Sequence, residues 1–296
     1  MPRPDRKTRI LAALATAGLL YCGSASAAPL LDPYAARPEG VGGGLNTEWV
    51  QVADDWHFSN YVYQGERIGD TGWGSGFWGV GDIPAAFALA DGDPNLVARA
   101  GGVSAQLSYA NDLYNSTWGI ASGWDKDHVR EVAPVVATSG QQTNYAARFS
   151  GYLYIAEAGL YDFGIFVDDA FSFSLIGAGG SALSVGRDTF IGASGRDFYT
   201  LSGANGGGVA LDVGYYALQL DYFNRLEAGV LDLGWWLPGD ARWQSIDGAQ
   251  LYAALPPVTL EQGGAVPEPS SVLLLLLGAG LLAWHRGRAR KMTAGT

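Results

Sequence analysis

Residues 148–177, RFSGYLYIAEAGLYDFGIFVDDAFSFSLIG, decide the fold class. Apolar residues alternate with polar or small ones along three short runs in this stretch. In the first run Phe149, Leu153 and Ile155 share one face, while Tyr152 and Tyr154 share the other. A period of two is typical of half-buried β-strands, and the glycine-containing breaks between the runs predict turns.

The second and third runs of this stretch show the same alternation: Tyr161, Phe163, Ile165 and Val167; and Phe171, Phe173 and Leu175. Two further runs downstream repeat it, GYYALQLDYFN at 214–224 and GVLDLGWWLP at 229–238. The 43 glycines among 296 residues are about twice the usual share and indicate many tight turns. We therefore predict a mostly β protein, built as an antiparallel β-sandwich or barrel.

The organisation of the chain follows from shifts in composition. Residues 28–44 and 256–265 are rich in proline and glycine and are predicted to be linkers around one β domain at 45–255. The best helical segment is DIPAAFALADGDPNLVARAG at 82–101, which Pro94 limits. The wider region 59–140 has no assigned place in the predicted sheets.

The strand sequences resemble the PA14 domain. The centre at 148–177 shows that family's aromatic-x-Gly strand, its Ala-Gly-x-Tyr-x-Phe segment and its Asp-Asp pair, and residues 214–236 resemble its later part. GLNTEWVQ at 44–51 is similar to its opening strand. The resemblance is firmest over 146–237, and it implies a PA14-like β domain. The region 59–140 departs from the family because it is longer than usual.

Asp168 and Asp169 are the sharpest candidate site. Adjacent carboxylates at a strand end repel each other unless a cation or hydrogen-bond donors offset the repulsion. The PA14 resemblance implies that the pair holds Ca²⁺ with Asn224, which matches the family's later asparagine, and that the ion coordinates sugar hydroxyls. The alternative is that both aspartates cap turn amides in a hairpin.

An aromatic loop, TGWGSGFWGVGD at 71–82, contains a second set of candidates. Its GSGFWG segment matches a dinucleotide-binding pattern, but no apolar strand precedes it and no helix-forming run follows. Trp73, Phe77 and Trp78 are instead candidates for stacking on sugar rings. The alternative is that these side chains pack in the core.

Charge and motif content exclude several function classes. Four Lys or Arg and one acid lie before residue 28 and four Lys or Arg after residue 285, so residues 28–285 hold 10 basic and 28 acidic residues and carry a net charge of −18. This charge argues against nucleic acid as a partner and is compatible with binding of divalent cations or with solubility alone. No H-E-x-x-H, G-x-S-x-G or multi-histidine pattern is present, so we expect no enzyme.

The N-terminus predicts export. Four basic residues precede an apolar run at 10–20, and Ala25-Ser26-Ala27 supplies a small-x-small cleavage pattern, so residues 1–27 are a predicted signal peptide. The single cysteine, Cys22, lies within it. The mature chain must therefore be stabilised by its core or by a metal ion rather than by disulfides.

The C-terminus, residues 266–291, has three parts in order. Pro267, Glu268 and Pro269 favour an extended chain. A short apolar helix at about 271–284 follows, and then the basic cluster: Arg286, Arg288, Arg290 and Lys291. The positive end is expected to stay in the cytoplasm while the domain is outside.

This tripartite end resembles the PEP-CTERM sorting signal of Gram-negative bacteria with exopolysaccharide systems. The resemblance implies recognition by an exosortase-type processing enzyme, with the chain anchored in the membrane before processing and then directed to the cell surface. The sequence as a whole leads us to expect an exported, envelope-directed, non-catalytic protein that binds carbohydrate, exopolysaccharide or matrix. Two alternatives stay open: a structural envelope component without a specific ligand, and a surface glycan hydrolase.

Overall fold

The computed structural model describes residues 31–34, 42–56, 62–63, 65–68, 76–118, 130–188, 197–202 and 208–256. The chain divides into two units, Met1–Pro256 and Pro257–Thr296. The second unit lies outside the described residues, as do the predicted signal peptide, the membrane helix at 271–284 and most of both linkers. Among the described residues no helix is long and apolar enough to span a membrane.

Two seven-stranded sheets and a small hairpin account for the described strands. The first sheet has the order β10-β9-β13-β7-β1-β4, with β16 paired to β7. Its strands are β1 Leu45–Val52, β4 Leu96–Ser104, β7 Tyr145–Ile155, β9 Ala170–Ile176, β10 Ala182–Arg187, β13 Gly214–Asn224 and β16 Leu251–Tyr252. All of its pairs are antiparallel.

The second sheet has the order β11-β8-β14-β5-β6, with β12 paired to β8 and β15 paired to β14. Its strands are β5 Ser108–Ala110, β6 Glu131–Val132, β8 Gly159–Asp168, β11 Asp197–Leu201, β12 Val209–Leu211, β14 Val230–Trp236 and β15 Gln244–Ser245. Only the β5–β6 pair of this sheet is parallel. The separate hairpin consists of β2 Val62–Tyr63 and β3 Glu66–Arg67.

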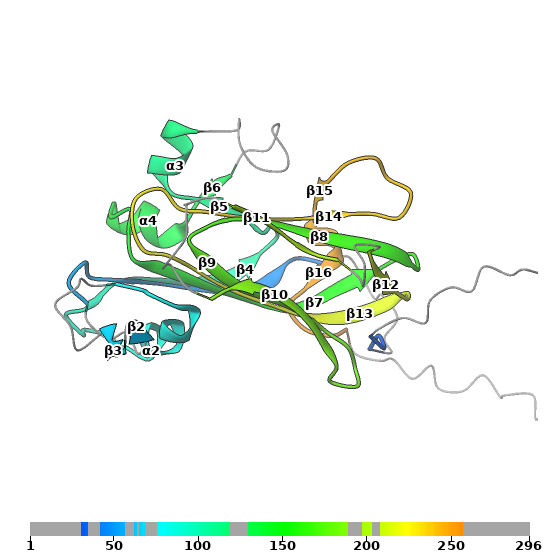
Figure 1. Cartoon of the computed structure of the whole chain (residues 1–296), viewed down its shortest axis with the longest axis horizontal. Coiled ribbons are helices and arrows are strands. Elements are labelled where there is room, and N and C mark those ends of the chain that lie inside the picture. The colour runs from blue at the N-terminus through cyan, green and yellow to red at the C-terminus, as the bar shows by residue number, and fades with distance from the viewer. Residues whose placement is uncertain are drawn as a thin grey trace, which may run out of the picture. The chain divides into compact units, whose positions relative to one another are not determined.

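The two sheets stack face to face and bury one main core between them (Figure 1). Side chains from the two sheets meet there: Trp49 lies with its ring centroid 4.9 Å from that of Tyr109, and Phe163 lies 5.7 Å from Phe173. The alternating residues predicted to share a face, from Phe149 through Leu175, are buried. The prediction of a mostly β, antiparallel sandwich is therefore confirmed.

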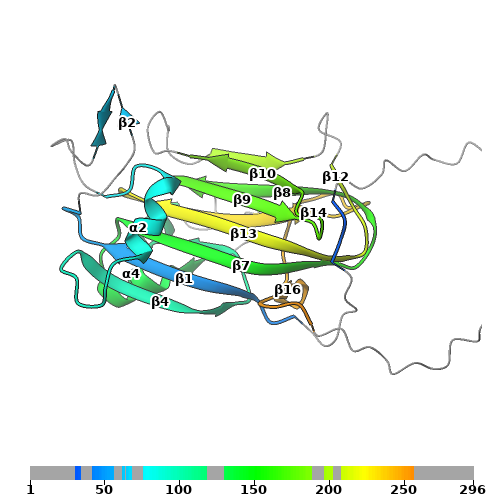
Figure 2. The same cartoon turned by 90° about the horizontal axis from the view of Figure 1, so that it is seen from below.

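Short helices cover the ends of the sandwich. They are α2 Ile83–Phe87, α3 Asp112–Thr117 and α4 Pro134–Ser139, with 3-10 turns at η2 Val80–Asp82 and η5 Gly248–Gln250. Helix α2 lies across one end of the outer face of the first sheet (Figure 2), where Ile83 and Ala86 pack with Val50 and Phe223 in a second apolar cluster. Among the described residues no other α-helix lies on that face.

The prediction of a helix over 82–101 is right for five residues and wrong for the rest. Helix α2 ends at Phe87, and residues 96–101 belong to strand β4, which pairs with β1 from Leu45↔Ser104 to Val52↔Leu96. Gly92, with φ +88°, and Pro94 break the helix. The backbone hydrogen bonds that β1 offers to β4 then outweigh the helical preference of an alanine-rich segment.

Candidate functional site

Asp168 and Asp169 lie where the chain leaves one sheet for the other. Strand β8 of the second sheet ends at Asp168, and strand β9 of the first sheet begins at Ala170, so Asp169 alone connects them. The peptide bond between the two aspartates is cis. Asp169 is only 5% exposed, so its carboxylate needs partners within the protein.

The end of strand β13 supplies those partners. The N–H of Asp169 donates to the Phe223 carbonyl oxygen at 3.3 Å, and the N–H of Arg225 donates to Oδ2 of Asp169 at 2.6 Å. The hydroxyl of Tyr222 donates to the Asp168 carbonyl oxygen at 2.7 Å. The structure therefore brings the aspartate pair against the residues that flank Asn224.

Asn224 is fully buried at this junction. Its Nδ2 donates to the Gln142 carbonyl oxygen at 3.2 Å, while its Oδ1 is buried and accepts no hydrogen bond from the described residues. Gly229 makes room for the side chain, because a Cβ there would lie 2.5 Å from Cγ of Asn224 and 2.4 Å from the Tyr145 hydroxyl. The amide of Asn224 and the hydroxyl of Tyr145 thus lie close together.

Burial dominates the electrostatics of the site. It raises the pKa of Asp169, an effect that the N–H of Arg225 and the positive charge of Arg187 only partly offset. Burial also raises the pKa of Tyr145, and the charges of Asp169 and Asp168 act in the same direction. Tyr145 therefore stays a neutral hydroxyl beside two carboxyl groups.

Arg225 lies on the other side of Asp169. Burial lowers the pKa of Arg225, while the charge of Asp169 opposes that shift. Its guanidinium carbon is 4.2 Å from the ring centroid of Trp78, which is a close cation–π contact. Asp169 thus has both a backbone donor and nearby cationic side chains. The backbone hydrogen bond resembles the alternative in which the aspartates cap backbone amides.

The donor set fits a calcium ion. Ca²⁺ takes carboxylate, amide and carbonyl oxygens, and the site offers two carboxylates and the Oδ1 of Asn224, a buried acceptor without a donor among the described residues. The part of the chain that the structure describes contains no group of three or more His, Cys, Asp or Glu able to hold a metal. A calcium ion at Asp168, Asp169 and Asn224 is therefore a hypothesis, which is taken up under the proposed function.

Two of the three aromatic candidates pack inside the protein and are not open for stacking on sugar rings. Phe77 is fully buried and stacks on Phe223, with ring centroids 5.5 Å apart and planes inclined by 26°. Trp78 is 7% exposed and carries the Arg225 guanidinium on its ring. Both rings pack behind the aspartate pair, in agreement with the packing alternative. Trp73 lies outside the described residues.

Several partners of the site were not predicted from the sequence. Gln142 lies just before β7 and Tyr145 is the first residue of β7, about eighty residues upstream of Asn224, and no motif marks them. Arg225 follows Asn224 directly, and its position next to a predicted ligand is the one signal that could have found it.

The family model of the PEP-CTERM protein-sorting motif matches residues 265–291. The match confirms the predicted PEP-CTERM sorting motif. The roles predicted for single residues of this segment stay predictions and lie outside the described residues: Pro267, Glu268, Pro269, Arg286, Arg288 and Arg290. The motif indicates export and sorting. No curated protein matches the chain.

Solved structures similar to the chain include PA14 domains, the family that the sequence resembles. The PA14 domain of the MpAFP antifreeze protein is 17% identical, with a TM-score of 0.38, over 76% of this chain and 98% of its own. The A domain of epithelial adhesin 9 from Candida glabrata, in complex with Galb1-4GlcNAc, is 15% identical over 76% and 97%, with a TM-score of 0.43. The PA14 sugar-binding domain of an RTX adhesin is 16% identical over 72% and 99%, with a TM-score of 0.36. None of these likenesses assigns a ligand to this chain.

Proposed function

We propose that the chain is an exported, non-catalytic surface protein that binds carbohydrate through a calcium ion held by Asp168, Asp169 and Asn224. The observation that carries the proposal is the Oδ1 of Asn224, a buried acceptor that receives no hydrogen bond from the described residues, in the cluster that contains the aspartate pair. An unsatisfied buried acceptor costs about 1–3 kcal/mol. A cation coordinated by that oxygen removes the cost.

Each residue has a distinct role in this proposal. Asp168 and Asp169 supply the negative charge, and burial of Asp169 makes its ionised form depend on a nearby cation. Asn224 supplies a neutral oxygen, which Gly229 and the Gln142 carbonyl hold in place. When bound, the calcium ion supplies coordination positions for sugar hydroxyls. The N–H of Arg225 and the hydroxyl of Tyr222 fix the aspartate pair from the β13 side.

The sorting motif sets where such binding takes place. We propose that the C-terminal segment anchors the chain in the membrane of a Gram-negative envelope until an exosortase-type enzyme processes it. The domain then lies at the cell surface, where glycans and exopolysaccharide are the available ligands. The match to residues 265–291 supports the sorting part of this proposal.

A glycan array tests the proposed function. The full chain, kept in detergent, is applied in calcium and again in chelator, beside the Asp169→Asn variant. We expect selective, saturable binding of at least one glycan that depends on calcium, and both chelator and the variant should abolish this calcium-dependent binding. An array without calcium-dependent binding would contradict the proposal, and release of a shortened glycan would show an enzyme instead.

A further inference from the structure

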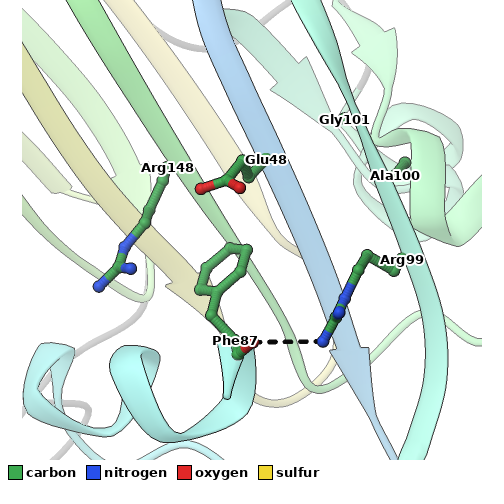
Figure 3. A pocket seen from close by; sticks show the side chains of 6 residues that line it. All are labelled: Glu48, Phe87, Arg99, Ala100, Gly101 and Arg148. Carbon is green, nitrogen blue, oxygen red and sulfur yellow. Dashed lines mark hydrogen bonds between the residues drawn. The ribbon is translucent and has the colours of Figure 1, made fainter. Parts of the chain in front are cut away.

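A pocket of about 530 Å³ opens on the outer face of the first sheet, beside α2. It is lined by Glu48, Phe87, Arg99, Ala100, Gly101 and Arg148. Figure 3 shows the side chains of Glu48 and Phe87 between the guanidinium groups of Arg148 and Arg99. None of these six residues belongs to the aspartate site described above.

Strand register explains why a pocket forms here. Gly101, Glu48 and Arg148 lie side by side on β4, β1 and β7, so all three face the same side of the sheet. Gly101 has no side chain, which leaves the space next to Glu48 open. The end of α2 then places Phe87 over the row, with the Arg148 guanidinium carbon 4.9 Å from its ring centroid.

Both arginines are fixed in position by neighbours. Nε of Arg148 donates to Asp221 at 3.2 Å, and Nη2 of Arg99 donates to the carbonyl oxygens of Phe87 at 3.2 Å and Leu89 at 2.9 Å. The terminal nitrogens of Arg148 have no hydrogen-bond acceptor among the described residues, and its side chain is 33% exposed. These nitrogens are therefore donors with open positions at the edge of the pocket, on a guanidinium held by Asp221 and Phe87.

Glu48 provides the complementary acceptor. It is exposed, and within the described ranges its carboxylate makes neither a hydrogen bond nor an ion pair, although it lies opposite Arg148 on the neighbouring strand. Arg148 pairs with Asp221 instead. The pocket thus presents a carboxylate with open acceptor positions beside guanidinium groups with open donor positions.

This arrangement selects a class of ligand. The three carboxylates of Glu48, Asp221 and Asp91 outnumber the two guanidinium groups of Arg99 and Arg148, so the pocket offers no surplus positive charge to an anion. Sugar hydroxyls donate and accept at once, and neighbouring hydroxyls can therefore donate to Glu48 while they accept from the arginines. A neutral polyhydroxylated ligand satisfies both sides, whereas an acidic one is repelled by Glu48.

A row of short polar side chains continues from the pocket across the outer face of the first sheet, whose strands β1, β7, β13, β9 and β10 lie next to one another in Figure 2. Cross-strand register places them on five adjacent strands: Asn46, Ser150, Gln219, Ser174 and Ser184. All five are neutral, and neighbouring strands set them about 4.8 Å apart. Such a row offers a regular series of hydroxyl and amide groups to an extended polymer.

We propose that the pocket and this row form a second saccharide site, which takes a neutral sugar chain without calcium. One sugar occupies the pocket between Glu48 and Arg148, and the following units lie along the row from Asn46 to Ser184. The site shares only the general ligand class with the proposed calcium site and uses other residues.

The test is calorimetric titration of the full chain in chelator, which removes calcium and so prevents binding at any calcium-dependent site. The probes are neutral hexose oligosaccharides, with uronic-acid and amino-sugar oligosaccharides of equal length for comparison. We expect a neutral oligosaccharide to bind. Glu48→Ala should raise its dissociation constant about tenfold or more, because a charged hydrogen-bond partner is lost. Glu131→Ala, which removes an exposed carboxylate on the second sheet, should leave it unchanged.

Two further variants separate the possible outcomes. Ser150→Arg places bulk and charge in the row and should weaken long oligosaccharides more than short ones. Asp169→Asn should not alter binding in chelator. If the wild type shows no calcium-dependent binding but still binds a neutral oligosaccharide in chelator, the proposed calcium site is contradicted and this second site is left intact. The second site is refuted if no neutral oligosaccharide binds in chelator, if uronic-acid or amino-sugar chains bind better, or if Glu48→Ala binds as wild type does. Glu48 is exposed, so its substitution should not change the melting temperature.

Discussion

Calcium should raise the melting temperature of the full chain, and Asp169→Asn should remove most of that rise. The carboxylate of Asp169 is 5% exposed and burial raises its pKa, so the calcium-free fold carries the cost of a poorly solvated charge. A cation that binds the ionised form stabilises the folded state by about 2.7 kcal/mol at a hundredfold excess over its dissociation constant. For a domain of this size that energy corresponds to a rise of about 5–10 °C.

The variant separates loss of calcium from loss of the fold. In Asp169→Asn the amide oxygen can still accept the N–H of Arg225, which lies 2.6 Å from Oδ2 in the wild type. The calcium-free variant should therefore melt close to the calcium-free wild type, because it also loses a buried charge. Asp91→Asn makes the same chemical change at a side chain that is 93% exposed and serves as the matched control.

Differential scanning calorimetry measures the melting temperatures of the three proteins in excess calcium and in chelator. Equal melting temperatures of the wild type in both solutions would show that the aspartate pair is only a structural cap. A rise that Asp169→Asn retains in full would place the ion elsewhere in the chain. Either result removes the residue-level basis of the calcium-dependent function.

Three further predictions concern the tail, the core and alkaline pH. Gln at Arg286, Arg288 and Arg290 should weaken membrane retention, because the positive end no longer opposes translocation, as fractionation of cells would show. Asp232→Leu should lower the free energy of unfolding, measured in urea, by about 3–5 kcal/mol. The reason is that the buried Arg130 guanidinium, 2.6 Å from the Asp232 carboxylate, loses this ion-pair partner. Adding Arg130→Met should recover part of the lost stability. Burial raises the pKa of Tyr216 to about 12, so stability present below pH 10 should fall by up to about 1.4 kcal/mol per pH unit as pH rises from about 10 to 12, and Tyr216→Phe should reduce that slope.

The sandwich could be predicted because the alternation of apolar and polar side chains is visible within the sequence of each strand. Strands β7, β8, β9, β13 and β14 each show the period of two over seven or more residues, and their predicted inward residues are buried. The adjacent carboxylates marked the aspartate pair as a candidate, and the PA14 resemblance implied Asn224 as its partner; the structure brings the two segments to one junction. Strand β4 was missed because its sequence, LVARAGGVS, is rich in alanine and glycine and lacks the alternating aromatic and large apolar residues of the other strands, so that its pairing with β1 decides its conformation.

The aromatic loop shows how a local pattern can mislead. A glycine-rich segment with exposed-looking aromatic residues suggests a binding platform, but Gly76 allows the segment to press against the sheet. Its φ is +86°, and a Cβ there would lie 1.8 Å from Oδ1 of Asn144. That close approach carries Phe77 into the second apolar cluster. The contact with Asn144 depends on the tertiary fold, so no sequence window contains it.

Strand β13 contributes to both proposed sites through its two faces. Asp221, which holds Arg148 of the pocket, points to the outer face, while Tyr222 points inward and fixes Asp168. Alternation along the strand assigns Asn224 to the same side as Tyr222. The hydrogen bonds and ion pairs of the two sites share no residue, so substitutions in one should leave the other unchanged. One antiparallel strand can therefore support a cation site at its end and a saccharide row across its outer face. Titrations with saccharide in calcium and in chelator then distinguish the two sites, because only binding at the cation site is lost in chelator.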